Sequence, residues 1–298
     1  MRRTVPALIV LAALAGAALT GCSASNEASA CTVTSGNGSD SVTATGKFGQ
    51  DPQAKVPSPL NVSKTESSTL IKGTGPRVNK GGAAELSVTI FDGSSGASQP
   101  TQTGVFPVVA SQISKGLANA LACTNQGSRI AVVIPQKDGA SMFSVQGTVV
   151  AVVDVDKALP NRATGHVRPA TPGFPTVILA PNGQPGIVIG DHSEPTKVSS
   201  ATLKQGDGAK TKKSDTLIVQ TQTVEWSDPT SASGSWEQGS PATQTLNDGS
   251  ALSSQLIGKR VGSQIIVQVP KSKSSDGNAS VTVVDILGVL PAAAASAQ

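Results

Sequence analysis

The chain has 298 residues, of which 14% are charged and 2% aromatic, with a formal net charge of +4. Leaving out Arg2 and Arg3 of an N-terminal apolar segment, 21 Lys and Arg face 19 Asp and Glu, a net charge of +2. So small a charge, without basic stripes interleaved with aromatics, excludes the usual nucleic-acid-binding surface. The length suits two modest domains and a tether, and the abundance of Gly, Ser, Thr and Val predicts mainly β structure.

The first 21 residues have the features of an export signal. Arg2 and Arg3 precede an apolar stretch too short to span a bilayer comfortably. The stretch ends in Leu19-Thr20-Gly21-Cys22, the pattern of a bacterial lipobox, in which the cysteine becomes the acylated first residue. An ordinary cleaved signal with a chance cysteine is the alternative. We therefore predict a lipoprotein signal peptide over 1–21 and lipidation, palmitate included, at Cys22. Such an anchor would hold the protein at the extracytoplasmic face of the cell membrane.

Two further cysteines, Cys31 and Cys123, remain after Cys22. Outside the cytoplasm an even pair is more often bridged than free, so we predict a disulfide between them. Two buried thiols are the alternative. Residues 22–59 are predicted as a small, polar spacer followed by an extended lead-in rich in Gly and Pro.

Two stretches of the chain match each other at a constant spacing. Residues 121–135 and 256–270 share Leu, Gly-Ser, Ile, Val and Pro at the same places, at an offset of 135 (256 − 121). In each stretch a glycine-containing turn leads into an apolar strand that ends at a proline. Such a match indicates duplication. We therefore predict two copies of one domain, over 60–159 and 196–290.

Each copy opens with a polar strand that ends in Gly-x-Gly, over 64–75 and 197–208. Another strand follows the glycines where a phosphate-binding loop would lead into a helix, so a turn is the favoured interpretation. The next strands are predicted over 84–91 and 216–226. The first of these alternates apolar and polar residues, as a sheet with one buried face requires.

A short helix and a final strand complete each copy. Apolar residues recur every fourth position in both predicted helices: Ile113, Leu117 and Leu121, and then Leu252 and Leu256. The final strands, predicted over 145–155 and 279–287, each contain Val-Asp followed by an apolar residue. Residues 291–298 are rich in alanine and are predicted to be a disordered tail.

Residues 160–195, between the copies, are dense in proline and glycine and are predicted to be a stiff linker. Residues 174–179 and 186–189 are candidates for short strands at the edge of one domain. His166 and His192 are the only histidines of the chain and both fall in this linker. This placement disfavours a Ser-His-Asp triad or a histidine metal site, so we predict no metal and no cofactor.

The order of these elements, with their residues, resembles the FKBP-type peptidyl-prolyl cis-trans isomerase (rotamase) domain. Segments 203–208, 234–237, 256–270 and 281–288 of the second copy carry the likeness. The first copy matches in its opening strand, helix, 127–135 and last strand but poorly between them, so it reads as the degenerate one. The resemblance implies an α+β fold, with two FKBP-like domains that each wrap an antiparallel sheet around one short helix.

In that family an apolar pocket of aromatic residues, aided by an aromatic–Asp pair, holds the proline ring and favours the twisted amide. Carried over to the second copy, the substrate-binding positions are Thr221, Leu252, Thr282, Ser274 or Ser275, and the pair Trp236-Glu237. The chain departs from the family here, because four of these places lack the expected aromatic and the chain contains no Tyr.

Structural alternatives exist for the same residues. Trp236 would serve equally as a packing residue, Glu237 as a solvated surface carboxylate, and Leu252 as core between helix and sheet. In the first copy the corresponding places hold Val88, Leu117, a loop (136–140) without any aromatic, and Ala151, and the aromatic–Asp pair has no counterpart.

Three functions follow from this pattern. The first is a membrane-anchored extracytoplasmic prolyl isomerase that helps exported proteins to fold, with weak activity that lies mainly in the second copy and depends on Trp236. The second is a non-catalytic protein-binding module that keeps the fold, and the third is a structural envelope lipoprotein. The expected partners are exported clients or envelope proteins, and the membrane through the lipid on Cys22.

Overall fold

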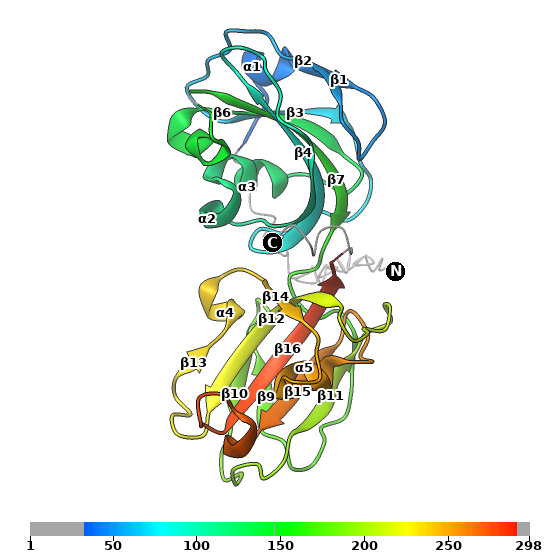
Figure 1. Ribbon diagram of the computed structural model, residues 1–298, viewed down its shortest axis with the longest axis vertical. Helices are drawn as coiled ribbons and strands as arrows, with labels where there is room; N and C mark the ends of the chain where they lie inside the picture. Colours follow the sequence, from blue (N-terminus) through cyan, green and yellow to red (C-terminus); the bar gives the residue numbers. More distant parts are fainter. Residues whose placement is uncertain (1–32, 146, 291–298) are drawn as a thin grey trace, which may run out of the picture. The chain divides into compact units, whose positions relative to one another are not determined.

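The fold is described from a computed structural model that defines residues 33–145 and 147–290 (Figure 1). Its strands form two large antiparallel sheets and two small two-stranded ones. None of the helices in these ranges is long and apolar enough to cross a bilayer. The predicted signal peptide, Cys22, Cys31 and the predicted tail lie outside the described residues, so the lipidation and the Cys31–Cys123 bridge stay predictions.

The first sheet has the strand order β3-β6-β7-β4-β5. Its strands are β3 (Glu66–Ile71), β4 (Ala83–Asp92), β5 (Gln102–Pro107), β6 (Arg129–Ile134) and β7 (Val149–Ala158). Two short helices, α2 (Ala110–Ile113) and α3 (Lys115–Leu121), pack on one face of it (Figure 1). Leu117 and Leu121 of α3 lie in one apolar core with Val132 of β6, so the helix stripe expected from the sequence is the face that is buried.

The second sheet has the order β13-β12-β16-β15-β11-β8, with β14 paired to β12. Its strands are β8 (His166–Val167), β11 (Ser199–Gln205), β12 (Thr216–Glu225), β13 (Ala232–Ser233), β14 (Ala242–Thr245), β15 (Gln264–Val269) and β16 (Ser280–Val289). Helix α5 (Ala251–Leu256) packs against it through Leu256, which shares a core cluster with Ile265 and Val284.

The two sheets share their strand order, because β11-β15-β16-β12-β14 repeats β3-β6-β7-β4-β5. They also share register shifts. Pairing with the last strand slips between Glu85 and Leu86 in β4 and between Ile218 and Val219 in β12. A duplication predicts this agreement, since an inserted bulge is inherited with the strand that carries it.

The helix of the first copy differs from the single short helix predicted. It is broken at Ser114, whose φ of 84° is incompatible with a continuing helix. The hydroxyl of Ser114 accepts a hydrogen bond from the Leu117 N–H at 3.3 Å and thereby caps α3. The break leaves α2 as a separate turn that ends at Ile113, next to β5 in chain order and in contact with it.

Residues 33–62 form a covering layer on the other face of the first sheet, which corrects the prediction of an extended lead-in. This segment contains α1 (Asn37–Asp40) and the small sheet of β1 (Thr43–Thr45) and β2 (Gln53–Lys55). Val42 of the segment packs in one cluster with Phe91 and Val133. The physical reason lies in β6, whose six residues are all buried, because a strand that is apolar on both faces needs cover on both.

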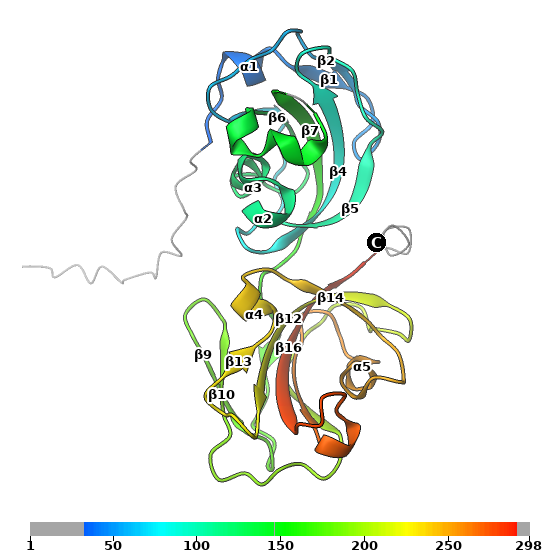
Figure 2. The ribbon, with the colours of Figure 1, turned by 60° about the vertical axis from the view of Figure 1, so that its left-hand side comes forward.

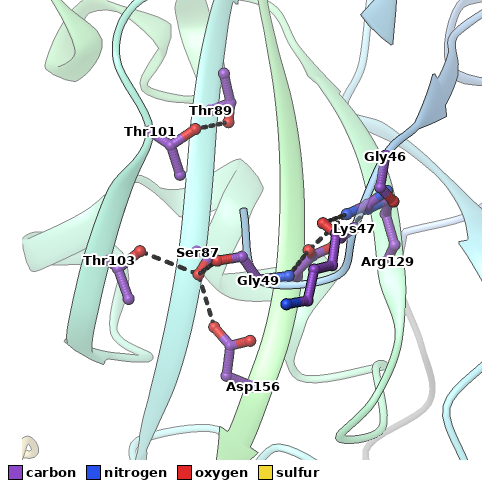
Figure 3. Close-up of polar contacts among 10 residues, drawn as sticks. Gly46, Lys47, Gly49, Ser87, Thr89, Thr101, Thr103, Arg129 and Asp156 are labelled. Carbon is purple, nitrogen blue, oxygen red and sulfur yellow. Dashed lines mark hydrogen bonds and ion pairs between the residues drawn. The ribbon is translucent and has the colours of Figure 1, made fainter. Parts of the chain in front are cut away.

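Polar contacts hold this cover in place (Figure 3). Fully buried Arg129 donates through Nε to Asp154 Oδ1 at 2.6 Å and through Nη2 to Asp154 Oδ2 at 2.8 Å. The same guanidinium donates to the carbonyl oxygens of Gly46 and Lys47, each at 3.1 Å, and the Gly49 N–H donates to Asp154 Oδ2 at 2.5 Å. One ion pair on the sheet therefore holds a single turn of the covering segment, residues 46–49, through three backbone groups.

The predicted linker also covers a sheet, which corrects its interpretation as a tether. The hairpin of β9 (Thr176–Leu179) and β10 (Pro185–Val188) begins and ends close to the two strand candidates of the sequence. Ile187 and Ile189 pack in one cluster with Ile266 and Val283 of the second sheet, on the face opposite α5. Packing removes the apolar side chains of the segment and the apolar face of the sheet from water together. The proline-rich segment therefore folds onto the second sheet.

In the second sheet, the residues that bond to the covering segment lie at the same strand positions as in the first sheet. Gln264 and Asp285 pair across β15 and β16 as Arg129 and Asp154 pair across β6 and β7. Asp285 accepts hydrogen bonds from Gln264 Nε2 at 2.8 Å and from the Ala163 N–H at 3.0 Å. Burial raises the pKa of the Asp285 carboxyl, and these hydrogen bonds offset part of that rise.

Candidate functional site

A cavity of about 270 Å³ opens between the first sheet and its helices. Its apolar lining comes from four elements, β4, β5, the helix pair and the 3-10 turn η2 (Ala140–Phe143). The side chains that make this lining are Val88, Ile90, Phe106, Ile113, Leu117, Met142 and Phe143, together with Pro100, which precedes β5. Gln99, Gln102, Gln112 and Ser144 also border it, so the cavity has an apolar body and polar groups around it.

Local backbone conformation places each wall of this cavity. Val88 and Ile90 alternate along β4 and so face the helix side of the sheet together. Turn η2 lies between two residues in the left-handed conformation, Gly139 at φ 98° and Ser144 at φ 56°. A side chain at Gly139 would meet the Ser114 Cβ at 2.7 Å, so glycine is what lets η2 approach the helix break.

A hydrogen bond fixes the aromatic side of the cavity. Gln99 Nε2 donates to the carbonyl oxygen of Phe143 at 3.0 Å. Phe143 is half-buried and packs against the core cluster of the first sheet, as does Phe106 from the end of β5. Two phenyl rings therefore contribute to one small apolar hollow that remains open to solvent.

In the described part of the chain, no Asp, Glu, Lys, Arg or His side chain lines this cavity. General acid–base chemistry and nucleophilic attack both need such groups, or an activated Ser or Cys beside one. Elsewhere in the described ranges no group of three His, Cys, Asp or Glu side chains could hold a metal ion. The cavity therefore offers an uncharged surface with an apolar body and amide donors at its border.

In the second copy the structure brings some of the predicted residues together. Leu252 and Thr282 line a second cavity of about 430 Å³, as do Ser274 and Ser275. Its lining also carries Ser250, Ser280, Lys273 and Asp276, so hydroxyls and charges dominate it. Thr282 shares a hydrogen bond of 2.9 Å with Thr223 of β12. This hollow is a polar counterpart of the cavity in the first copy.

The other predicted residues lie apart from that cavity. Trp236 and Glu237 belong to α4 (Ser235–Gln238), beside β12, and neither lines the second cavity. Glu237 Oε1 accepts hydrogen bonds from Gln222 Nε2 at 2.9 Å and from Gln184 Nε2 at 2.8 Å. Gln222 alternates with Thr221 and Thr223 along β12, so it points to the sheet face opposite Thr223.

Thr221, also predicted, does not line the cavity either. Its N–H donates to Ser235 Oγ at 2.7 Å, which ties the start of α4 to β12. Trp236 Nε1 is buried without a hydrogen-bond partner in the described part of the chain. The roles proposed for Trp236, Glu237 and Thr221 stay predictions, and their positions do not place them with Leu252 and Thr282.

The sequence analysis missed the aromatic residues of the first cavity. No aromatic residue occupies the places carried over to the first copy, but Phe106 and Phe143, at other positions, line its cavity. A signal was present, since four of the five Phe residues precede the predicted linker and Phe143 follows the polar loop of that copy by three residues. The two left-handed residues that direct Phe143 toward the sheet produce no periodic sequence pattern from which its position could be predicted.

Comparison with known proteins gives a structural likeness alone. No protein-family model and no curated protein matches the chain. Among solved structures, the three FKBP domains of wheat FKBP73 match at 10% identity and a TM-score of 0.33, over 76% of this chain and 94% of theirs.

Two further matches are also FKBP proteins. FkpA from Escherichia coli matches at 19% identity and a TM-score of 0.28, over 39% of this chain and 52% of that one. The N-terminal domain of FKBP42 from Arabidopsis thaliana matches at 16% identity and a TM-score of 0.29, over 42% and 98%. TM-scores this low do not establish a common fold, and we rest no inference on them.

Proposed function

We propose that this protein is a lipid-anchored, extracytoplasmic FKBP-like protein that binds proline-containing segments of exported proteins and isomerises them slowly. The cavity of the first copy carries the proposal: an apolar, uncharged hollow with Phe106 and Phe143 in its wall, between sheet and helices. The sequence resemblance to FKBP-type isomerases, which the second copy mainly carries, supports the class of function but not its location in the first copy. The anchor rests on the lipobox pattern that ends at Cys22.

Prolyl isomerisation requires few functional groups in such a cavity. Rotation about an X-Pro bond faces a barrier of about 18–20 kcal/mol, because resonance holds the amide planar. A site that excludes water and grips the ring disfavours the polar planar amide relative to the twisted one. Amide donors such as Gln99 or Gln102 would then bond the peptide carbonyls. Without a tyrosine hydroxyl in the whole chain, we expect modest rate enhancement.

The second cavity suits this role less well. Hydroxyl and charged side chains line it, and they retain water that a proline ring would have to displace without replacing their hydrogen bonds. We therefore place the proposed activity in the first copy. Trp236 would contribute to it in neither cavity, since it lines neither.

The test uses the unacylated chain from residue 23 to 298 and a short proline peptide whose isomerisation is followed by protease-coupled absorbance. Phe143→Ala removes a ring, of which we take about 80 Å² to be buried against the ligand, less than half of what a fully buried Phe covers. At about 25 cal/mol per Å² this is about 2 kcal/mol, and a loss of that size slows catalysis about 30-fold. Leu252→Ala, in the second cavity, is the matched control and should leave the rate unchanged.

The opposite pattern, in which Leu252→Ala abolishes turnover while Phe143→Ala keeps the parental rate, would show that the active site lies in the second copy. Turnover lost in Trp236→Ala alone would restore the role expected from the sequence.

A non-catalytic binding module is the second candidate, favoured by the absence of any carboxylate from the lining of the first cavity. Calorimetric titration with the same peptide separates the two functions. Binding that Phe143→Ala weakens, with no detectable turnover in the parent, assigns the chain to the binding class. Neither binding nor turnover would exclude both.

A further inference from the structure

A groove of about 250 Å³ lies between the second sheet and the segment that covers it. Ala201 and Leu203 of β11 line it from the sheet, and Phe174 and Val177 line it from the covering segment. The β9–β10 hairpin of this segment lies on the sheet face opposite α5 (Figure 2). Because Leu252 of α5 lines the polar cavity of the second copy, the groove and that cavity are separate sites on opposite faces.

The walls of the groove are apolar. Phe174, Val177 and Leu203 pack against the buried cluster that contains Ile266. Val167 of β8 extends the wall although its side chain is 80% exposed. A large apolar side chain held at the edge of an apolar hollow is typical of a ligand-binding groove rather than of plain surface.

A β-bulge turns one cation toward the groove. The pairing of β11 with β15 shifts in register between Thr202 and Lys204, so that Lys204 lies opposite Gln264. Both Lys204 and Gln264 line the groove. Side chains alternate between the faces of a regular strand, so without the bulge Leu203 and Lys204 would point to opposite faces. The bulge therefore places a lysine beside the apolar wall.

Arg168 is the second cation of the groove. Its backbone N–H donates to the carbonyl oxygen of Leu203 at 2.8 Å, which holds the residue beside the wall. Within the described ranges, the Arg168 guanidinium forms no hydrogen bond or ion pair. The guanidinium is therefore available to an anionic ligand.

The carboxylates near the groove are engaged elsewhere. No Asp or Glu of the described chain lines it. Asp285 attracts Lys204, but its side chain is 1% exposed and already accepts a hydrogen bond from Gln264. Glu194 pairs with Lys271 at 3.0 Å. The border of the groove therefore carries positive charge.

At the corresponding place in the first copy the chain itself fills the space. Arg129 stands where the second copy has Gln264, and Ile71 stands where it has Lys204. The Arg129 guanidinium donates to two carbonyl oxygens of the covering segment and lies 6.0 Å from the ring centroid of Phe48. Gln264 is shorter and uncharged, and the cations of the second copy lie at the border of the groove instead. The groove thus distinguishes the second copy from the first.

We propose that this groove binds a single hydrocarbon chain with a carboxylate head, the chemistry of a fatty acid. The apolar walls remove the chain from water, and Arg168 and Lys204 provide charge-assisted hydrogen bonds to the carboxylate. An extended peptide suits the groove less well, because each of its buried residues carries an N–H and a C=O that need partners. The apolar walls provide no such partner. This binding is independent of the acyl anchor and of the proposed isomerisation.

The test uses the chain 23–298, which lacks the anchor position Cys22. Decanoate is titrated into the protein by calorimetry, below the concentration at which it forms micelles. Decyltrimethylammonium, which has the same chain length and a cationic head, is titrated in parallel. We expect one saturable site for decanoate and at least about tenfold weaker binding of the cation, because its charge meets two cations. Trp226 packs against the same cluster as the groove walls, so its fluorescence gives a second readout.

Substitutions then locate the ligand. Arg168→Gln and Lys204→Gln should each weaken decanoate binding about two- to fivefold, the range of an exposed ion pair. Val167→Ser should weaken it about threefold through lost apolar contact. Lys210→Gln and Val188→Ser, an exposed basic and an exposed apolar residue of the second copy that do not line the groove, are the matched controls and should bind like the parent.

Several results would overturn the proposal. The first is a parent chain without saturable decanoate binding, and the second is equal affinity for decyltrimethylammonium. The third is an Arg168→Gln/Lys204→Gln variant that binds as the parent does, with its unchanged circular dichroism showing that it is folded. A peptide of alternating leucine and glutamate that binds where decanoate does not would assign the groove to a protein partner instead.

One further variant separates this site from the cavity of the first copy. Decanoate binding that is lost in Phe143→Ala but parental in Val167→Ser would place the ligand in that cavity and overturn the proposal. We expect the reverse, because Phe143 does not line the groove. Failure of the isomerisation assay would leave the decanoate result unchanged, so the two proposals stand or fall separately.

Discussion

The buried ion pair of the first sheet allows a sharp test of how the covering segment is held. Arg129 is fully buried, and Arg129→Ala would leave Asp154 buried with its main counter-charge gone. Breaking such a pair from one side costs about 3–5 kcal/mol. The hydrogen bonds to Gly46 and Lys47 are lost as well, at about 1 kcal/mol each. The sum approaches the whole stability of an ordinary domain, about 5–15 kcal/mol.

The positions of the tryptophans allow the unfolding of the second copy to be followed separately in this experiment. Both tryptophans, Trp226 and Trp236, belong to the second copy, so their fluorescence reports on that copy while far-UV circular dichroism reports on all strands. In a urea titration Arg129→Ala should move part of the circular dichroism transition to lower urea and leave the fluorescence transition in place. A loss below about 1 kcal/mol would refute this account.

A paired substitution distinguishes the lost charge from the lost packing. Arg129→Met/Asp154→Leu removes both charges and keeps approximate volume, and such replacements are often neutral or stabilising. We expect it to be far more stable than Arg129→Ala. Arg129→Gln copies the Gln264–Asp285 arrangement of the second sheet and should fall between the two. Equal losses in all three variants would mean that the charge of Asp154 matters little.

Two further predictions follow from the buried carboxylate of the second sheet and from the cysteines. Burial raises the pKa of Asp285 above the 3.8 of a free side chain, so the folded state binds its proton more tightly than the unfolded state does. Its contribution to stability is therefore present below the unfolded pKa and lost as the pH rises through the folded one. Fluorescence-monitored stability of Asp285→Asn should change less between pH 4 and 7 than that of the parent, and an identical profile would contradict this. Intact mass of the unreduced mature protein should correspond to a chain that begins at acylated Cys22 and lacks two hydrogens for the Cys31–Cys123 bridge. An unmodified mass with two reactive thiols would refute both assignments.

Much of the fold was predictable because apolar and polar residues alternate clearly along several strands. The strand expected after the shared turn of the second copy is β15, and the strands expected over 84–91 and 216–226 match β4 and β12 to within one residue at each end. What failed was the interpretation of the segments before each copy. Their glycines and prolines indicate irregular backbone, which is correct, but irregular backbone can pack as closely as a helix when the sheet beneath is apolar on both faces.

The candidate site was harder to predict because tertiary contacts make it. Val88 and Leu117 were identified at their places in the repeat, and both line the first cavity. Phe143 reaches that cavity through η2, whose position depends on two left-handed residues and on close approach to Ser114. None of these conditions produces a regular spacing of residues in the sequence. In the second copy two positions carried over from the family resemblance, Leu252 and Thr282, line one cavity. The resemblance of Trp236-Glu237 to the family's pair did not predict that Glu237 bonds to Gln222, on the other face of the sheet.

The burial of both faces also bears on where each copy begins. All six residues of β6 and all six of β15 are buried, so neither sheet can keep its outer face dry without the segment that precedes it. Asp154 and Asp285, at matching positions, each accept a hydrogen bond from a backbone N–H of that segment. Each sheet therefore needs its covering segment in order to fold. A fragment that starts at 60 or at 196 would expose an apolar face, and units meant to fold alone would have to begin near 33 and near 160.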